Sequence, residues 1–236
     1  MKNNPLILMY HSIDNTKLKR LKGIRVSPKN FEKQISYLAK KGFKSYTLSE
    51  MIEQKDTLEA KSVVITFDDG YRDNLANALP ILKKYGFKAT IFVIINRFDN
   101  DWSLHRKEKN AGIVNKIEKL SDADIKTLLK SGRIEIGAHT MEHKNFLKIS
   151  QNEKKQEIVK SKEILEQKFN IECKTFSYPF GIYKSGDEKL VKDAGFVGAV
   201  TTEVRRADLN KDSLFLLPRV NVKDEYLKFI YKVRKF

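Results

Sequence analysis

The sequence predicts an α/β fold in which parallel strands, covered by helices, form a closed or nearly closed barrel. Short apolar segments rich in β-branched residues alternate with segments of helical periodicity along the chain. The apolar runs are nearly continuous, as expected for a parallel sheet that is buried on both faces. The length of 236 residues and the hydrophobic content of 41% suit one domain with a substantial core. Roughly seven or eight strand units fit such a barrel.

Strands are expected where a short apolar run is bounded by turn residues. The expected strands cover residues 6–10, 45–48, 63–67, 89–95, 134–140, 174–178, 197–202 and 214–220.

Helices are expected where apolar residues recur at helical spacing after a capping residue. Ser27 before Pro28, and Ser121 and Ser150 with an acid three residues later, are such starts, while Gly86 follows a helix end. The expected helices cover residues 28–41, 74–85, 121–130, 150–169, 187–194 and 224–236, with a short one from residue 49. Residues 97–115 have no clear period and are expected to form a long loop.

The chain is strongly basic, with a formal net charge of +16. Its Lys and Arg residues are spread along the chain, which predicts a cationic surface with weak attraction for polyanions, acidic glycans or anionic membranes. Nucleic acid is not an expected partner, because no zinc-finger spacing, RNA-binding signature or isolated basic tail is present. The last helix is basic and amphipathic; it either packs on the barrel or also touches an anionic membrane. The sequence carries no signal for an oligomeric state.

Cysteine content and hydropathy bear on location. Cys173 is the one cysteine, so an internal disulfide is excluded. The first apolar run, residues 6–10, is too short for a secretory signal, and no segment has the length needed to span a bilayer. A cytoplasmic location is therefore expected.

Two adjacent carboxylates, Asp68 and Asp69, follow the apolar strand 63–67 and precede Gly70. The carboxyl ends of parallel strands carry the active sites of α/β proteins, and glycine allows a sharp exit. One acid can hold a metal ion while the other stays free as a base. Alternatively, both acids cap the following helix.

His139 and His143 lie at the end of the expected strand 134–140. Four residues apart, they would fall on one side of a helical turn and could bind one cation. Thr140 stands where the zinc-protease motif requires Glu, which excludes that motif. Two incidental surface histidines are the alternative. Two His and one Asp would leave coordination positions open, as catalytic metal sites do.

A third stretch, residues 176–181, also lies at the end of an expected strand. Pro179 and Gly181 favour a fixed turn, which either is an ordinary turn or aims a backbone N–H at a developing oxyanion.

In this order the three stretches resemble the polysaccharide deacetylase family, also called carbohydrate esterase family four or the NodB-homology domain. Residues 66–70 match its first motif in full, residues 139–143 match its second, and residues 177–181 match its third in part. The resemblance implies a distorted (β/α)7-type barrel that forms a single catalytic domain over residues 1–236. It also implies metal-dependent removal of acetyl groups from N-acetylated amino sugars of a glycan or glycan precursor.

The resemblance implies roles by position. Asp68 would be the general base. Asp69, His139 and His143 would hold a divalent ion, with zinc the default for these donors. The backbone N–H of Phe180 would stabilise the oxyanion. The expected substrate-binding residues are Tyr178, Pro179 and Trp102, whose flat ring would either stack on a sugar or anchor its own loop.

Two positions depart from the family pattern. Ser177 stands where the third motif usually begins with Arg, and Arg219 stands where the last motif, Leu-x-His, usually supplies the acid. Residues 9–12 resemble the permuted branch of the family, which includes poly-N-acetylglucosamine deacetylases and takes its acid from the N-terminal strand. That makes His11 the expected catalytic acid and Arg219 an expected orienting partner of Asp68.

Three other functions fit the same residues less well. The same metal site could serve an O-acetyl esterase or an amidohydrolase of another small N-acyl substrate. An inactive glycan-binding domain is the third, but binding alone needs no free carboxylate beside a metal.

Overall fold

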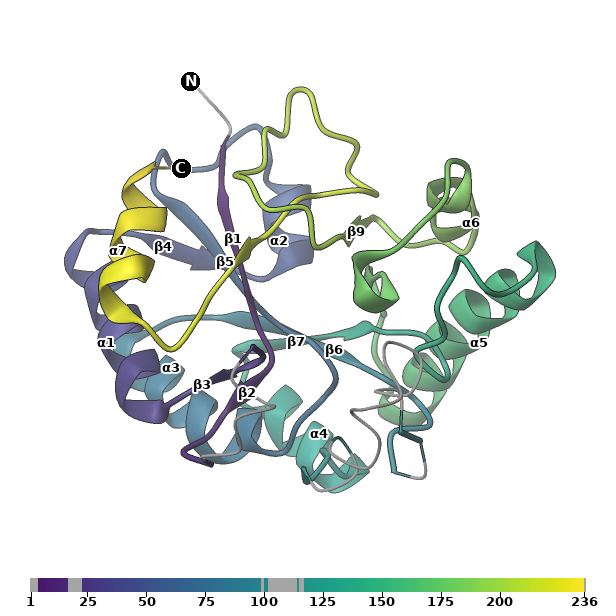
Figure 1. The fold of residues 1–236 in the computed structure, drawn as a ribbon, viewed down its shortest axis with the longest axis horizontal. Helices are drawn as coiled ribbons and strands as arrows, with labels where there is room; N and C mark the ends of the chain where they lie inside the picture. The colour runs from purple at the N-terminus through teal and green to yellow at the C-terminus, as the bar shows by residue number, and fades with distance from the viewer. Residues whose placement is uncertain (1–3, 17–22, 99, 102–113, 115–116, 236) are drawn as a thin grey trace.

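A curled parallel sheet runs through the computed structural model, with helices along its outer side (Figure 1). The structure describes residues 4–16, 23–98, 100–101, 114 and 117–235. The strand order is β10-β1-β5-β6-β7-β8-β9, and β4 also pairs with β5. The strands are β1 (Leu6–Tyr10), β4 (Lys44–Tyr46), β5 (Ser62–Phe67), β6 (Ala89–Val93), β7 (Ile134–Ala138), β8 (Thr175–Ser177), β9 (Gly198–Val200) and β10 (Val220–Asn221).

Strand β5 lies at the centre of the sheet. It pairs with β1 over its whole length, from Leu6↔Val63 to Tyr10↔Phe67. On its other side the first half pairs with β4 and the second half with β6. Every residue of β5 is buried, because both faces of the sheet are covered. The acids that follow Phe67 therefore lie near the middle of the side of the sheet at which the parallel strands end.

Successive side chains of β1 and β5 point to opposite faces of the sheet. Leu6, Leu8 and Tyr10 pack in the larger apolar cluster, whereas Ile7 packs in the smaller one together with Val64. The same alternation sends Thr66 and then Asp68 toward the smaller cluster, where the side chain of residue 219 lies. This periodicity directs Asp68, the first of the two adjacent acids, toward the inside of the curl.

The curl closes only in part. Val200 and Leu217 form a single parallel bridge between β9 and the segment that leads to β10, and Thr201 N–H donates to the Leu217 carbonyl at 2.9 Å. The predicted α/β fold with a distorted barrel is confirmed, in the form of a curled half-barrel.

In the part of the chain that the structure describes, seven α-helices follow the expected pattern closely. Ser121 and Ser150 form the expected capping boxes, and Ser27 accepts the N-capping hydrogen bond of the first helix. The helices are α1 (Pro28–Lys40), α2 (Leu48–Glu53), α3 (Leu79–Tyr85), α4 (Asp122–Lys130), α5 (Gln151–Phe169), α6 (Asp187–Asp193) and α7 (Tyr226–Lys235).

Three expectations are corrected. The predicted helix 74–85 begins as a π-helical turn, Asn74–Ala78, because Pro80 has no N–H to continue an α-helical ladder. The predicted strand 214–220 is reduced to β10, since Pro218 likewise cannot donate to a ladder. The strand predicted at 45–48 ends at Tyr46, because Thr47 caps α2.

One small sheet was not expected. Strand β2 (Ser12–Ile13), which follows β1, pairs in parallel with β3 (Arg25–Val26).

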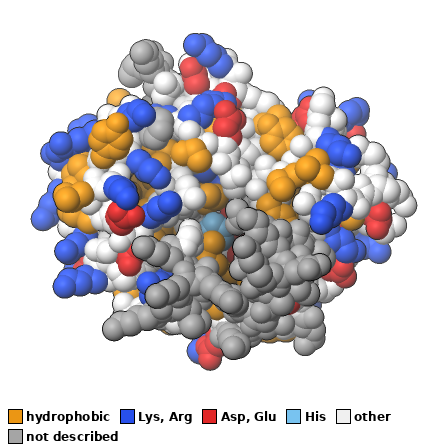
Figure 2. Space-filling model, in the orientation of Figure 1, with side chains coloured by type: hydrophobic (Ala, Val, Ile, Leu, Met, Phe, Trp, Pro, Cys, Tyr) orange, Lys and Arg blue, Asp and Glu red, His pale blue; other side chains and the backbone are white. Residues whose placement is uncertain are grey.

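Among the described residues, no helix has the length and apolar character needed to cross a membrane. Lys and Arg side chains are spread around the visible face rather than gathered in one patch (Figure 2).

Candidate active site

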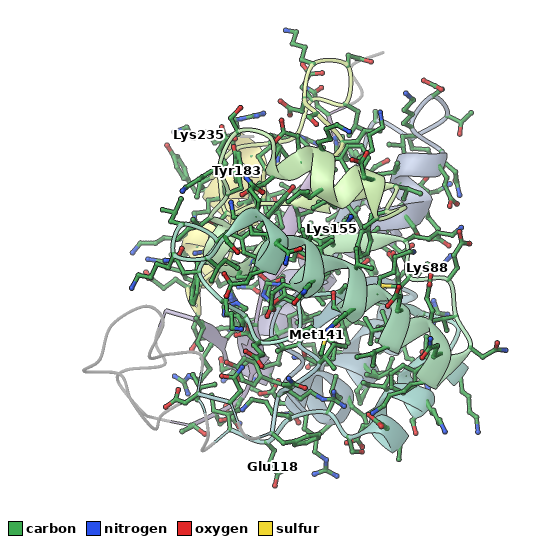
Figure 3. The ribbon with its side chains drawn as sticks, turned by 90° about the vertical axis from the view of Figure 1, so that its right-hand side faces the viewer. Lys88, Glu118, Met141, Lys155, Tyr183 and Lys235 are labelled. Atoms are coloured by element: carbon green, nitrogen blue, oxygen red, sulfur yellow. The ribbon has the colours of Figure 1, made fainter. Side chains whose placement is uncertain are left out.

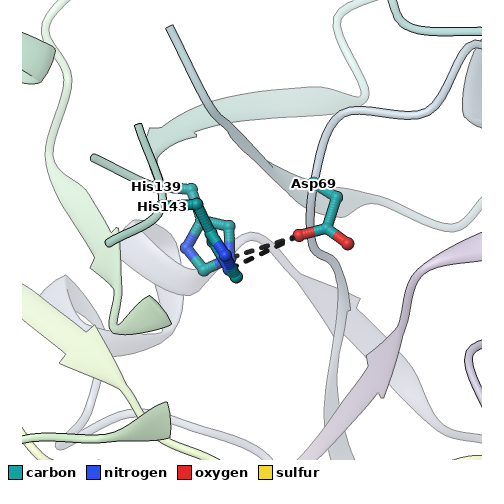
Figure 4. Close-up of side chains that lie close together, drawn as sticks. All are labelled: Asp69, His139 and His143. Atoms are coloured by element: carbon teal, nitrogen blue, oxygen red, sulfur yellow. Dashed lines mark hydrogen bonds and ion pairs between the residues drawn. The ribbon is translucent and has the colours of Figure 1, made fainter. Parts of the chain in front are cut away.

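Asp69, His139 and His143 converge on one point beside the sheet edge (Figure 4). Asp69 Oδ1 lies 3.5 Å from His139 Nε2 and 3.7 Å from His143 Nε2, and the two Nε2 atoms are 3.1 Å apart. Ligands bound at zinc distances in a tetrahedron lie roughly 3.3 Å from one another. Two imidazoles and one carboxylate at this spacing therefore fit a single divalent ion and leave a coordination position open.

The histidines approach one another through a loop rather than through the helical turn expected from their spacing. Thr140 and His143 both have positive φ angles, 67° and 55°. The His143 N–H donates to Thr140 Oγ1 at 2.9 Å, which closes the loop on itself. Two left-handed residues in four turn the chain more sharply than an α-helix does. The expected convergence is therefore present, but its backbone geometry differs.

His139 is held in one orientation by the turn that follows β8. Its Nδ1 lies 2.7 Å from the Ser177 carbonyl oxygen, so this nitrogen carries the proton and donates it. Nε2 is then unprotonated and carries the lone pair that a metal needs. The ring of His143 packs edge-on against Phe180, with centroids 4.3 Å apart. A hydrogen bond therefore orients the imidazole of His139, and an aromatic contact packs that of His143.

Asp69 and His143 are in their deprotonated forms at neutral pH. Burial by itself would raise the pKa of Asp69, but the surrounding imidazoles, His139 foremost, lower it below its usual range. Burial and the neighbouring His139 lower the pKa of His143 to about 3. The Tyr71 hydroxyl donates to Asp69 Oδ2 at 3.0 Å, on the oxygen away from the histidines. At neutral pH, protons therefore compete only weakly with a metal ion for Asp69 and His143.

Asp68 and Arg219 form a fully buried ion pair on the inner face of the sheet. Arg219 Nη1 lies 2.8 Å from Asp68 Oδ1, and Nη2 lies 2.7 Å from Oδ2. Burial would raise the pKa of Asp68, but the charge and hydrogen bonds of Arg219 outweigh it and lower the pKa. Thr66 Oγ1, Ser177 Oγ and the Thr201 carbonyl accept the other Arg219 hydrogen bonds. These contacts replace the expected alternative in which the acids cap a helix.

His11 lies on the same rim as the two acids. Its Nε2 is 4.0 Å from Asp68 Oδ2, and its side chain is 19% exposed. Asn74 Nδ2 donates to the His11 carbonyl at 2.8 Å, and Asp73 accepts from Ser12 Oγ at 2.6 Å. A histidine side chain is visible in a hollow near the centre of the molecular face in Figure 2. His11 is thus held by its backbone while its ring reaches both solvent and Asp68.

The third motif forms a tight turn, Pro179–Gly181. Phe180 is left-handed, with φ 58°, and the turn is closed by Gly181 N–H to the Tyr178 carbonyl at 2.8 Å. The side chains of Tyr178 and Pro179 are buried. Their contact with a substrate stays a prediction, and Trp102 lies outside the described residues.

Four supporting residues were not expected from the sequence: Tyr71, Asp73, Asn74 and Glu157. A signal existed for Glu157, because it precedes the buried Ile158 on the buried face of α5, and a charge on a buried helix face needs partners. No comparable pattern singled out the other three.

Known proteins share this fold and these motifs. The sequence pattern of the polysaccharide deacetylase family matches residues 55–199. The chain is 33% identical to YxkH of Bacillus subtilis (strain 168), whose name assigns it provisionally to these deacetylases, over 92% of this chain and 70% of YxkH. It is 27% identical to the poly-beta-1,6-N-acetyl-D-glucosamine N-deacetylase of Staphylococcus aureus (strain MRSA252), over 98% and 82% of the two chains.

The fold similarity extends over the same range. The crystal structure of BA0330 from Bacillus anthracis, provisionally named a polysaccharide deacetylase, superposes with a TM-score of 0.82 at 26% identity, covering 98% of this chain and 69% of that one. The matched pattern, the 33% identical relative and the converging motif residues lead to one conclusion: the chain belongs to the polysaccharide deacetylase family of hydrolases.

Proposed function

We propose that this protein is a metal-dependent de-N-acetylase acting on N-acetylated amino sugars of a glycan or glycan precursor. The observation that carries the proposal is the Asp69–His139–His143 cluster at the end of β5, beside the buried Asp68–Arg219 pair. The similarity to the S. aureus N-deacetylase supports the substrate class. One catalytic domain over residues 1–236 is part of the proposal, because His11 and Arg219 join the site from opposite parts of the chain.

A divalent ion held by these three residues would polarise the acetyl carbonyl and lower the pKa of a bound water. Zinc is the proposed ion, since two imidazoles and one carboxylate are a donor set typical of catalytic zinc. The protein's own contribution is to hold the three donor atoms 3.1 to 3.7 Å apart.

Asp68 is the proposed general base for the attacking water. Arg219 contacts both of its oxygens, but each carboxylate oxygen offers about two acceptor positions, so a position on Asp68 remains for the proton of water. Arg219 also fixes the plane of the carboxylate, because a guanidinium binds it as a rigid fork. The lowered pKa keeps Asp68 ionised and ready to accept a proton.

His11 is the proposed general acid. An amine is a poor leaving group unless it is protonated as the C–N bond breaks. His11 Nε2 lies 4.0 Å from Asp68 Oδ2, and this closeness to the proposed base supports the assignment. The backbone N–H of Phe180, in its left-handed turn, is the proposed oxyanion donor. Tyr178, Pro179 and Trp102 are proposed to contact the sugar.

Two further expectations stay predictions. Phe229 and Val233 of α7 are buried, which supports packing on the barrel, whereas Leu227 and Tyr231 are 79% and 63% exposed. Binding to anionic liposomes at low salt would test a membrane contact by the exposed pair. The cytoplasmic location expected from the sequence would be tested by fractionation of the source cells.

The decisive experiment measures acetate release from chemically defined substrates. The panel contains β-1,6- and β-1,4-linked N-acetylglucosamine oligomers, an O-acetylated oligosaccharide and a small N-acetyl amine, each with and without a chelator. Chelator-sensitive release from the N-acetylated oligomers is expected. Preferential release from the O-acetylated sugar would support an esterase instead, and glycan binding without any release would support an inactive binding domain.

A further inference from the structure

Glu157 contacts the loop that carries the two histidines. Its Oε2 accepts hydrogen bonds from two consecutive backbone N–H groups, those of Met141 at 3.0 Å and Glu142 at 2.9 Å. The side chain is buried and comes from the middle of α5. In Figure 3, Met141 lies beside α5, the helix that also carries Lys155. A carboxylate from a helix thus binds the backbone between two candidate metal ligands.

We propose that Glu157 is a positioning residue that holds the His139–His143 loop in its metal-binding conformation. The inference rests on the proposed metal site. It goes beyond that site by assigning a residue that does not itself face the ion.

The loop conformation needs external support because its backbone is strained. Thr140 and His143 both occupy the left-handed region, which is unfavourable for residues other than glycine. Hydrogen bonds between an ionised carboxylate and backbone N–H groups are among the stronger ones in proteins. Two of them on one oxygen can therefore offset strain that the loop cannot offset by itself.

The loop is held from two opposite elements. On its carbonyl side, Ile95 N–H donates to the Thr140 oxygen at 3.2 Å, and Asn96 N–H donates to the Met141 oxygen at 2.9 Å. On its N–H side the two bonds go to Glu157. The carbonyl contacts come from residues 95 and 96, just after β6, and the N–H contacts come from α5. Loss of Glu157 would leave the loop attached on one side.

Glu157 also has a cationic neighbour. Lys144 Nζ lies 3.5 Å from Glu157 Oε1. Lys154, one turn earlier on α5, is committed to Asp187 at 2.7 and 2.8 Å. A buried carboxylate without partners would be costly, so the two loop N–H groups and Lys144 account for an acid at this position.

Metal affinity of the folded protein tests the proposal directly. Glu157→Ala is compared with wild type and with Glu163→Gln, a control on the exposed face of α5. Affinity for Zn²⁺ is measured by competition with a chromophoric chelator, and the Co²⁺-substituted absorption spectrum reports ligand geometry. Glu157→Ala is expected to weaken Zn²⁺ binding by about 10- to 100-fold, the usual effect of losing an outer partner of a metal site. At saturating metal its kcat should recover toward the wild-type value.

A second variant keeps the test decisive if Glu157→Ala does not fold. Glu157→Gln retains an accepting oxygen but not the charge, so its affinity should fall between wild type and Glu157→Ala. Wild-type affinity and an unchanged Co²⁺ spectrum in the folded Glu157 variants would overturn the positioning role. His139→Ala separates the two hypotheses: if it also keeps wild-type affinity, the proposed metal site itself is wrong.

Discussion

Arg219 and Asp68 are separated by 151 residues, yet they share two hydrogen bonds of 2.8 and 2.7 Å inside the curl of the sheet. Asp68 directly follows the central strand β5, whereas Arg219 directly precedes β10. Ser177, at the position where the family usually has Arg, accepts a hydrogen bond from the same guanidinium at 3.2 Å. A cation therefore reaches the carboxylate from a different segment of the chain, and a small side chain at position 177 leaves room for it.

We predict that replacing Arg219 raises the pKa of Asp68. Burial raises that pKa and Arg219 lowers it, so without the cation Asp68 stays protonated to higher pH. In Arg219→Gln the acidic limb of kcat/KM should therefore move to higher pH. Loss of one partner of a buried pair should also cost about 3–5 kcal/mol of stability, measurable by urea unfolding. Arg219→Lys, which keeps the charge, is the matched control and should shift the limb less. If the acidic limb of the kcat/KM profile is unchanged in both variants, Arg219 does not set the pKa of the catalytic base.

We predict that His11→Gln loses about 10²- to 10⁴-fold in turnover of N-acetylated substrates, the usual contribution of a general acid. The protein should remain folded and keep its metal, because His11 is not among the three converging ligands. Hydrolysis of 4-nitrophenyl acetate should be largely retained, since its leaving group departs without a proton. Equal losses on both substrates would speak against His11 as the acid and for a role in positioning.

We predict that the protein binds about one divalent ion through Asp69, His139 and His143. His139→Ala should lose most of its metal, because its Nε2 lies 3.1 Å from that of His143 and no other described His or Cys joins this cluster. Elemental analysis after gel filtration measures the stoichiometry, with Asp68→Asn as a control that leaves the three ligands intact. Metal retained by His139→Ala at the wild-type level would refute the assignment.

We predict that Asp73 makes the apo-protein less stable as the pH rises from about 4 to 6. Burial raises the pKa of Asp73 from 3.8 to about 6, so in this window the folded state holds a proton that the unfolded state has released. The stabilisation is complete below the unfolded pKa and is lost as pH rises through the folded one. A shift of this size corresponds to at most roughly 3 kcal/mol.

The matched variant for this prediction is Asp73→Asn, which can still accept from the Ile13 N–H now bound at 3.0 Å. Urea unfolding of both proteins in the presence of a chelator, at pH 4.5 and pH 7, gives the comparison. Asp73→Asn should show the smaller change between the two pH values. Identical changes in the two proteins would mean that Asp73 titrates normally.

The local sequence pattern was sufficient to predict those elements of the fold that depend on residues close together in the chain. The central strand, the capping boxes and the end of α3 at Gly86 depend on apolar runs and on backbone preferences within a few residues. The same holds for the acids after β5, since a carboxylate placed directly after a buried parallel strand lies at the sheet edge. Departures from expectation came at Pro80 and Pro218, where a missing N–H ended or changed an element.

The spacing of His139 and His143 predicted that they converge, but it did not predict the backbone conformation that brings them together. A helical turn and a left-handed loop both bring residues four apart together, and the sequence does not discriminate between them. The loop is selected by contacts from Ile95 and Asn96, which follow β6, and from Glu157 of α5. Local propensity opposes the positive φ of Thr140 and His143, so only tertiary contacts can impose it.

The sequence by itself therefore determined the strands and helices, the identity of the candidate metal ligands and the edge of the sheet at which they meet. The tertiary structure decided which further side chains support them: Tyr71 on Asp69, Asn74 on the backbone of His11, and Glu157 on the loop of the two histidines. The physical reason is the distance along the sequence over which each interaction acts. Strand and cap preferences act over a few residues, whereas a buried charge or a strained loop is stabilised by whichever partners the completed fold brings within hydrogen-bond distance, and nothing local specifies them.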